Sequence, residues 1–179
     1  FYDFTPNREK GLDTVEACKG ILDGSVKAFI GLGGNFSRAV PETEAIEKAW
    51  RNLRLHVQIS TKLNRNHLLP GAVTYILPCL GRIERDRQAS GDQTVSVEDS
   101  TACIHGSKGW RPPASPELLS EPKIVAEMAK ATVPGKSSIP WDAWVGNYAL
   151  VRDEIERAYP QYFKDFNKRF MQPGGFHRD

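Results

Sequence analysis

The chain has 179 residues, of which 40% are hydrophobic and 26% are charged, and its formal net charge is +2. These values are ordinary for a globular protein, and so balanced a charge excludes a general nucleic-acid or membrane-surface binder. The sequence also lacks an apolar run of about eighteen residues, which a membrane-spanning helix would need. We therefore expect a folded domain with no nucleic-acid or membrane partner.

Three cysteines, Cys18, Cys79 and Cys103, lie far apart, and none belongs to a C-x-x-C pair. This spacing argues against an iron–sulfur or structural zinc site within the chain, so we expect no metal here. Free thiols are typical of a reducing compartment, which favours a cytoplasmic location. Each cysteine is expected to be a small buried hydrophobic residue.

The first predicted element is a helix that starts after Asp13. Asp13 suits the N-cap, Glu16 completes a capping-box pattern, and Gly24 marks the end of the helix. Between these signals, apolar residues recur at helical spacing, at Val15, Cys18, Ile21 and Leu22.

Three strands are predicted next, at residues 26–32, 55–60 and 72–77, with a helix opened by Pro41 between the first two. Pro78 stops the third strand. A strand, a helix and a strand at this spacing form a βαβ crossover, which requires adjacent parallel strands and a right-handed connection. The predicted fold class is therefore α/β, as a Rossmann-like three-layer domain with a mostly parallel sheet flanked by helices.

The second half of the chain predicts one more strand, at residues 94–99, and further helices. Ser120 suits the N-cap of one helix, and residues 136–179 predict a helical C-terminal extension of the same domain. We interpret residues 1–179, which begin with Phe1 rather than Met, as a single α/β domain from inside a larger enzyme. The predicted inward-facing residues are Ile124, Val125, Met128 and Ala129 in the first helix and Phe163, Phe166 and Phe170 in the extension, which are expected to pack onto the sheet.

The loop that closes the first strand, residues 31–36, reads Gly-Leu-Gly-Gly-Asn-Phe. Adjacent glycines allow a ligand to approach the backbone, and in an open parallel sheet ligands bind beyond the carboxyl ends of the strands. A tight turn with Asn35 in the left-handed conformation is the alternative. A nicotinamide fingerprint fits poorly, because it needs glycine where Phe36 stands and an acid where the second strand ends in Ser60.

Two further loops follow the second and third strands at the same predicted edge. Residues 60–67 offer hydroxyl, amide, ammonium, guanidinium and imidazole groups, which suit a polar base, ribose or phosphate, or form a solvated loop. The loop after the third strand contains Gly81 and Glu84. A functional acid pair of Glu84 with Asp86 competes there with a surface ion-pair network that includes the neighbouring arginines Arg82, Arg85 and Arg87.

Together these three loops carry a resemblance. The stretch Gly33-Gly-Asn-Phe-Ser-Arg-Ala-Val-Pro41, the strand end Val57-Gln-Ile-Ser-Thr61, and Leu77-Pro78 followed by Glu84 resemble the formate-dehydrogenase-like alpha subunits of the molybdopterin oxidoreductases. The resemblance covers about residues 10–135. Phe36 and Ile59 depart from the family pattern, since they stand where proline and an acid are usual.

The resemblance implies a bis-molybdopterin guanine dinucleotide cofactor, one arm of which this domain would hold. The molybdenum ligand and any iron–sulfur cluster would lie outside the chain, in the remaining domains of the same polypeptide, so the segment alone is predicted to be inactive. The implied cofactor-binding residues are Gly33, Gly34, Asn35 and Phe36 in the first loop, Ser60, Thr61, Lys62, Asn64 and His67 in the second, and Gly81 and Glu84 in the third.

Two other classes of function stay open. A nicotinamide-dependent dehydrogenase domain would share the βαβ unit. A non-catalytic protein-interaction module would present Trp110, Trp141 and Trp144 as a patch that faces a partner.

Overall fold

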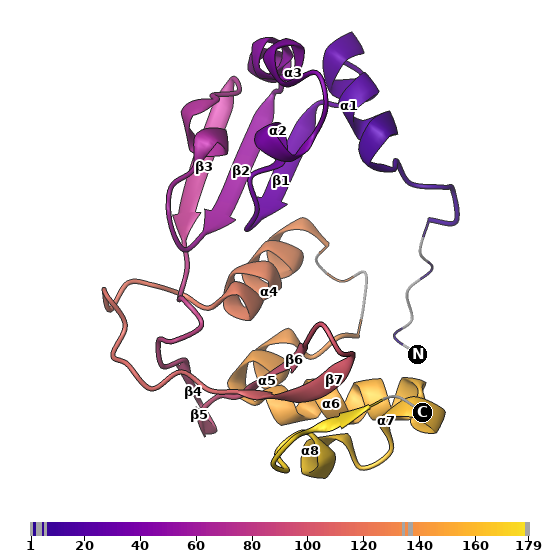
Figure 1. The fold of residues 1–179 in the computed structure, drawn as a ribbon, viewed down its shortest axis with the longest axis vertical. Helices are drawn as coiled ribbons and strands as arrows, with labels where there is room; N and C mark the ends of the chain where they lie inside the picture. The colour runs from indigo at the N-terminus through magenta and orange to yellow at the C-terminus, as the bar shows by residue number, and fades with distance from the viewer. Residues whose placement is uncertain (1, 3–4, 6, 134, 136–137, 178–179) are drawn as a thin grey trace. The chain divides into compact units, whose positions relative to one another are not determined.

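A computed structural model describes residues 2, 5, 7–133, 135 and 138–177 (Figure 1). The chain forms two compact units. The N-terminal unit comprises residues 5–79, and the C-terminal unit comprises residues 80–179 together with residues 1–4. None of the helices among the described residues has the length and apolarity needed to cross a lipid bilayer.

The first helix, α1, spans Thr14–Asp23 and begins and ends as predicted. The Asp13 carboxylate accepts a hydrogen bond from the Glu16 backbone N–H, and the Glu16 carboxylate accepts one from the Asp13 backbone N–H. Gly24 closes the helix at φ 76°. Fewer of its apolar residues are buried than the helical spacing predicted. Cys18 and Ile21 are buried, whereas Val15 and Leu22 are 56% and 42% exposed.

The parallel sheet of the N-terminal unit confirms the predicted strands. β1 (Ala28–Leu32), β2 (Leu55–Ser60) and β3 (Val73–Pro78) pair in parallel in the order β1-β2-β3. Each strand lies within two residues of its predicted bounds.

The connection between β1 and β2 differs from the single predicted helix. It contains α2 (Phe36–Ala39), α3 (Thr43–Ala49) and the 3-10 turn η1 (Trp50–Asn52). A residue before proline avoids the helical conformation, and Val40 is accordingly extended before Pro41. The helix therefore restarts at Thr43, after Glu42, rather than at the proline.

The core of this unit lies on one face of the sheet. The ring of Phe29 in β1 packs against Trp50, at 4.7 Å between centroids, and against Phe36, at 5.1 Å. The same core contains residues of all three helices and of the segment after the 3-10 turn η2 (Arg65–Leu68). Among the described residues of this unit, the helices cover one face only, so a three-layer arrangement is not formed within it.

The C-terminal unit contains antiparallel strands, so the prediction of a mostly parallel sheet holds for the N-terminal unit alone. The predicted strand at 94–99 exists as β6, but a tight turn returns the chain directly. Asp99 accepts hydrogen bonds from the backbone of Thr101 and Cys103, and Ala102 takes φ 62°. The pairs are β4 (Arg87–Gln88) with β5 (Gly91–Asp92), and β6 (Val95–Glu98) with β7 (Cys103–Ser107), which also pairs with β8 (Phe176–His177).

The helices of this unit follow the sequence prediction in part. Ser120 caps α4 (Glu121–Thr132) as predicted, but Ile124 and Ala126 are buried while Val125 is 43% exposed. Phe166 and Phe170 pack with Ile104 and Phe176, hence against the antiparallel sheet. Residues 136, 137, 178 and 179 of the predicted extension lie outside the described residues. Its other helices are α5 (Trp141–Gly146), α6 (Tyr148–Ala158), α7 (Pro160–Phe163) and α8 (Phe166–Arg169).

Candidate functional site

The loops after β1 and β2 begin at the same edge of the sheet. In the register, Leu32 lies beside Ile59, which lies beside Leu77. The backbone N–H of Gly33 donates to the Ile59 carbonyl at 2.7 Å, so the first loop starts against the end of β2. This is the carboxyl edge of a parallel sheet, where ligands of open α/β folds bind.

A turn of two glycines opens the first loop. Gly33 and Gly34 have φ values of 66° and 67°, which are unfavourable for residues with a side chain. A Cβ built on either glycine has no atom within 4 Å, so space is open beside both. Asn35 has φ −136°, so the alternative of a tight turn with a left-handed Asn35 is not formed, and the two glycines take that conformation instead.

Side chains from the second loop and from β2 hold this turn by its carbonyl groups. Gln58 Nε2 donates to the Gly33 carbonyl at 3.1 Å, and Asn64 Nδ2 donates to the Gly34 carbonyl at 2.6 Å. The amide groups that follow Gly33 in the turn differ from its own, which is bonded to Ile59. Among the described residues, the backbone N–H groups of Gly34, Asn35 and Phe36 have no acceptor. Three successive free amides beside open space are a feature that binds anions in proteins.

A buried chain of hydrogen-bonded side-chain amides supports the turn. Gln58 and Asn66 are 0% and 1% exposed, and Asn66 Nδ2 donates to Gln58 Oε1 at 3.3 Å. The Ser37 backbone N–H donates to Asn66 Oδ1 at 3.0 Å. Gly31 leaves room for this chain, because a Cβ there would lie 2.7 Å from Gln58 Oε1. Sequence reasoning missed these residues, although a glutamine inside an apolar strand signals a buried polar group that needs partners.

In the second loop, two of the predicted contact residues position the backbone. Asn64 Oδ1 accepts from the Asn66 backbone N–H at 3.0 Å, and the Asn64 backbone N–H donates to His67 Nδ1 at 2.9 Å. Both hydrogen-bonding atoms of the Asn64 side chain are thus in use. Thr61 and Lys62 are exposed, and Ser60 Oγ donates to the Lys62 carbonyl at 2.9 Å.

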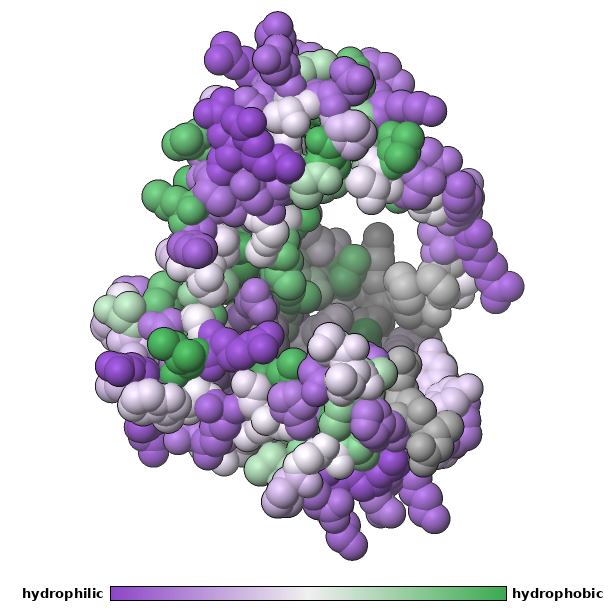
Figure 2. All heavy atoms as spheres, viewed as in Figure 1, coloured by the Kyte–Doolittle hydropathy of each residue, from purple (hydrophilic) through white to green (hydrophobic). Residues whose placement is uncertain are grey.

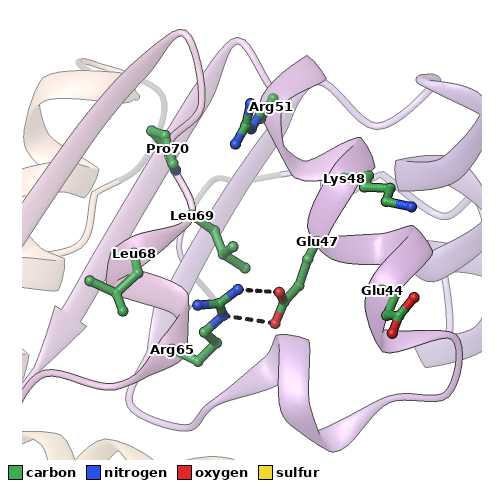
Figure 3. Close-up of a pocket in the computed structure, with 8 residues that line it drawn as sticks. All are labelled: Glu44, Glu47, Lys48, Arg51, Arg65, Leu68, Leu69 and Pro70. Atoms are coloured by element: carbon green, nitrogen blue, oxygen red, sulfur yellow. Dashed lines mark hydrogen bonds and ion pairs between the residues drawn. The ribbon is translucent and has the colours of Figure 1, made fainter.

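The next residue of this loop ties it to α3. Figure 3 shows Arg65 and Glu47 facing each other across a pocket of about 660 Å³, where two hydrogen bonds join them. Arg38 adds a second ion pair to Glu47 at 3.2 Å. The hydrogen bond from Arg65 holds the pKa of Glu47 below its usual value. The pocket is lined by charged and apolar residues of α3, η1, η2 and the two residues after η2, and none of the predicted site residues lines it.

The two remaining predicted site residues, Gly81 and Glu84, belong to the C-terminal unit and bind each other. The Gly81 backbone N–H donates to Glu84 Oε2 at 2.6 Å, and the Ala114 backbone N–H donates to Glu84 Oε1 at 2.5 Å. Both carboxylate oxygens therefore fix local backbone. The surface ion pairs of this region centre on Asp92, which lies 3.5 Å from Arg85 and 3.9 Å from Arg87.

The tryptophans of the C-terminal unit have separate surroundings. Trp141 and Trp144 pack edge to face at 6.0 Å and line an apolar hollow of about 240 Å³ between α4, α5 and α6. Trp110 is 66% exposed and lies 4.7 Å from the Arg111 guanidinium. No group of three or more His, Cys, Asp or Glu side chains that could hold a metal ion exists among the described residues.

Comparison with known proteins gives relatives over nearly the whole chain, although no protein-family model matches it. It is 43% identical over 176 residues to Protein YdeP of Escherichia coli. It is 41% identical over 175 residues to a protein of Mycobacterium tuberculosis named as an uncharacterized oxidoreductase. These matches cover 98% of the chain but only 23% and 22% of the relatives, so the chain spans about a quarter of their length.

Proposed function

We propose that this chain is part of a molybdopterin-dependent oxidoreductase, and that it binds the guanine-dinucleotide arm of a bis-molybdopterin guanine dinucleotide cofactor. The oxidoreductase class is supported by the mycobacterial relative, which carries that name and matches 98% of the chain. The cofactor assignment rests on the family resemblance of the strand-end loops. The rest of the polypeptide would be the partner of this segment.

The observation that carries the proposal is the glycine turn at the end of β1. Its amide groups at Gly34, Asn35 and Phe36 have no acceptor among the described residues, and the space beside Gly33 and Gly34 is open. Phosphate oxygens accept hydrogen bonds from such amides, and each bond to a charged group contributes about 1.5–3 kcal/mol. Gln58 and Asn64 hold the carbonyls, so the amides keep their direction without a ligand.

The residues present fit the phosphate and ribose part of such a ligand better than its base. Lys62 adds a cation to the second loop, and Thr61 adds a hydroxyl. The stretches 31–36 and 60–67 contain no Asp or Glu that could accept from the donor groups of a guanine edge. We therefore assign the phosphate to this edge and the reading of the base to other parts of the protein. When bound, the cofactor supplies the redox chemistry, while this chain binds and orients it.

The test compares Gly34→Val with Asn35→Ala in the full-length protein. A side chain at Gly34 would enter the open space and would strain a backbone at φ 67°, at about 1–2 kcal/mol. Asn35→Ala leaves the amides in place. We expect Gly34→Val to lose most of the guanine nucleotide and molybdenum per polypeptide, and Asn35→Ala to lose less.

Gly174→Val is the matched control, because Gly174 has φ 83° and open space but lies in the C-terminal unit. Circular dichroism of each variant verifies folding. A folded Gly34→Val protein with full guanine content would show that the turn does not hold the cofactor.

A further inference from the structure

One carboxylate lies between the two segments that hold the glycine turn. Figure 2 shows mostly hydrophilic residues over α2 and α3, and most charged side chains there are exposed. Glu47 of α3 differs from them, because its side chain is only 14% exposed. Glu44 of the same helix is exposed and has no ion pair among the described residues. The two glutamates of α3 therefore serve different purposes.

Glu47 is bound on both of its carboxylate oxygens. Arg65 donates from Nε to Oε1 at 2.9 Å and from Nη2 to Oε2, as Figure 3 shows across the pocket. Arg38 Nη2 lies 3.2 Å from Oε1. A bidentate contact between an arginine and a carboxylate fixes direction as well as distance. Because the carboxylate is largely shielded from water, salt screens this contact less than it screens an ion pair at the surface.

Each of the two arginines belongs to a segment that acts on the turn. Arg38 lies in α2, the helix that begins with the last of the three free amides. Arg65 begins η2 and directly follows Asn64, whose side chain donates to the Gly34 carbonyl. Glu47 therefore joins the segment that carries the amides to the segment that holds a carbonyl of the turn.

We propose that Glu47 is a positioning residue for the anion-binding turn. It holds α2 and η2 together through Arg38 and Arg65, and so keeps the three free amides directed at a common ligand. It touches no ligand atom itself. The inference rests on the proposed function, since it concerns how the same turn holds its ligand.

The sign of the expected effect separates positioning from simple electrostatics. A carboxylate repels a nearby anionic ligand, so its neutralisation by itself favours binding. If Glu47 positions the turn, its neutralisation should weaken binding instead, because the two arginines lose their common charged partner. A loss of ligand on removal of a negative charge is therefore the signature of the positioning role.

The test compares Glu47→Gln with Glu44→Gln in the full-length protein. Both changes keep the size of the side chain and remove one negative charge from α3. We expect Glu47→Gln to contain about two- to fivefold less guanine nucleotide per polypeptide than the parent protein, as for the loss of a contact between coupled residues. Glu44→Gln should contain as much guanine as the parent protein.

Ile46→Val controls for a loss of stability alone. Ile46 is fully buried in the core beside Glu47, and removing one methyl group there lowers the free energy of unfolding without touching the ion pairs. This variant should keep the guanine content of the parent protein. If it loses as much guanine as Glu47→Gln, the role of Glu47 is structural only and the inference is wrong.

A second readout does not depend on the cofactor. The Ser37 backbone N–H of α2 donates to Asn66 Oδ1 of η2 at 3.0 Å, so its hydrogen exchange reports whether the two segments stay together. The exchange rate should rise by a similar factor in Glu47→Gln, and by less in Glu44→Gln and Ile46→Val.

Two results would overturn the inference. One is a gain of guanine in Glu47→Gln, which would show that Glu47 merely repels the ligand. The other is an exchange rate at Ser37 that Glu47→Gln leaves unchanged. Guanine measured in the parent protein separates the two proposals. A parent protein without guanine sinks the cofactor assignment, and the exchange rate at Ser37 then decides the role of Glu47 by itself.

Discussion

The two units of the chain differ in how completely they satisfy their own polar groups. In the C-terminal unit, Arg152 is 8% exposed, and its guanidinium donates to Asn167 Oδ1 at 2.6 Å and to the Thr94 carbonyl at 2.8 Å. In the N-terminal unit, buried polar atoms of five residues have no partner among the described residues. They are Asn35 Oδ1, Ser37 Oγ, Trp50 Nε1, His56 Nε2 and His67 Nε2.

This difference indicates which unit needs something more. A buried polar atom without a partner costs about 1–3 kcal/mol, so native proteins leave few of them. The N-terminal unit combines such atoms with free amides at Gly34 to Phe36 and with exposed apolar side chains on the edge strands β1 and β3. It is the unit in which a ligand has most to contribute.

The largest expected effect tests whether the two units are separate in stability. Trp50 is 0% exposed in the core of the N-terminal unit, and Phe166 is 2% exposed in that of the C-terminal unit. Removing either ring leaves a cavity, so Trp50→Ala and Phe166→Ala should each cost about 3–5 kcal/mol of the free energy of unfolding. Hydrogen exchange should rise for Trp50→Ala in residues 5–79 and for Phe166→Ala in residues 80–177. Equal rises in both units for either variant would contradict separate stability.

A smaller effect compares the two helix caps. Ser120 caps α4, and its hydroxyl also lies 2.8 Å from the Tyr148 hydroxyl in a buried pair. Asp13 caps α1 at an exposed position. Ser120→Ala should therefore cost about 1–3 kcal/mol, and Asp13→Ala about 1 kcal/mol. Urea unfolding of the two variants measures both costs, and an equal loss would show that the link to Tyr148 adds nothing. Ser120→Thr, which keeps the hydroxyl, should recover most of the loss.

The smallest expected effect is a pH dependence of the stability of the N-terminal unit. Burial lowers the pKa of His56 below its ordinary value of 6.5, and the ring donates from Nδ1 to the Leu69 carbonyl. Because the folded form binds the proton less readily than the unfolded form, stability from this group is complete above the unfolded pKa. It is lost as the pH falls through the lowered folded pKa.

Hydrogen exchange of residues 5–79 between about pH 7 and pH 5 measures this loss. His56→Gln keeps a donor toward Leu69 and removes the titration, so its stability should vary less over this range. A decline as steep as in the parent protein would assign the effect to other groups.

The contrast between the units also explains which parts of the fold could be predicted. β1, β2 and β3 follow one another along the chain, and their apolar runs and the prolines beside them appear in the printed sequence. In the C-terminal unit, β7 pairs with β8, so that Cys103 lies beside His177. Nothing local to either strand predicts a pairing over that separation, and the prediction of a mostly parallel sheet does not hold for that unit.

For the candidate site, the sequence alone determined the glycine turn, the strand ends and the caps at Asp13 and Ser120, because each depends on residues close in the chain. Only the tertiary structure decided the roles of the polar side chains. Asn64 was predicted to contact the cofactor, but both hydrogen-bonding atoms of its side chain bind backbone groups. Gln58 was not predicted as a site residue, and its side chain donates to the Gly33 carbonyl. The physical reason is that a buried hydrogen-bonding side chain binds whichever partner the fold places beside it. Gly33 lies 25 residues from Gln58 in the sequence, and Gly34 lies 30 residues from Asn64.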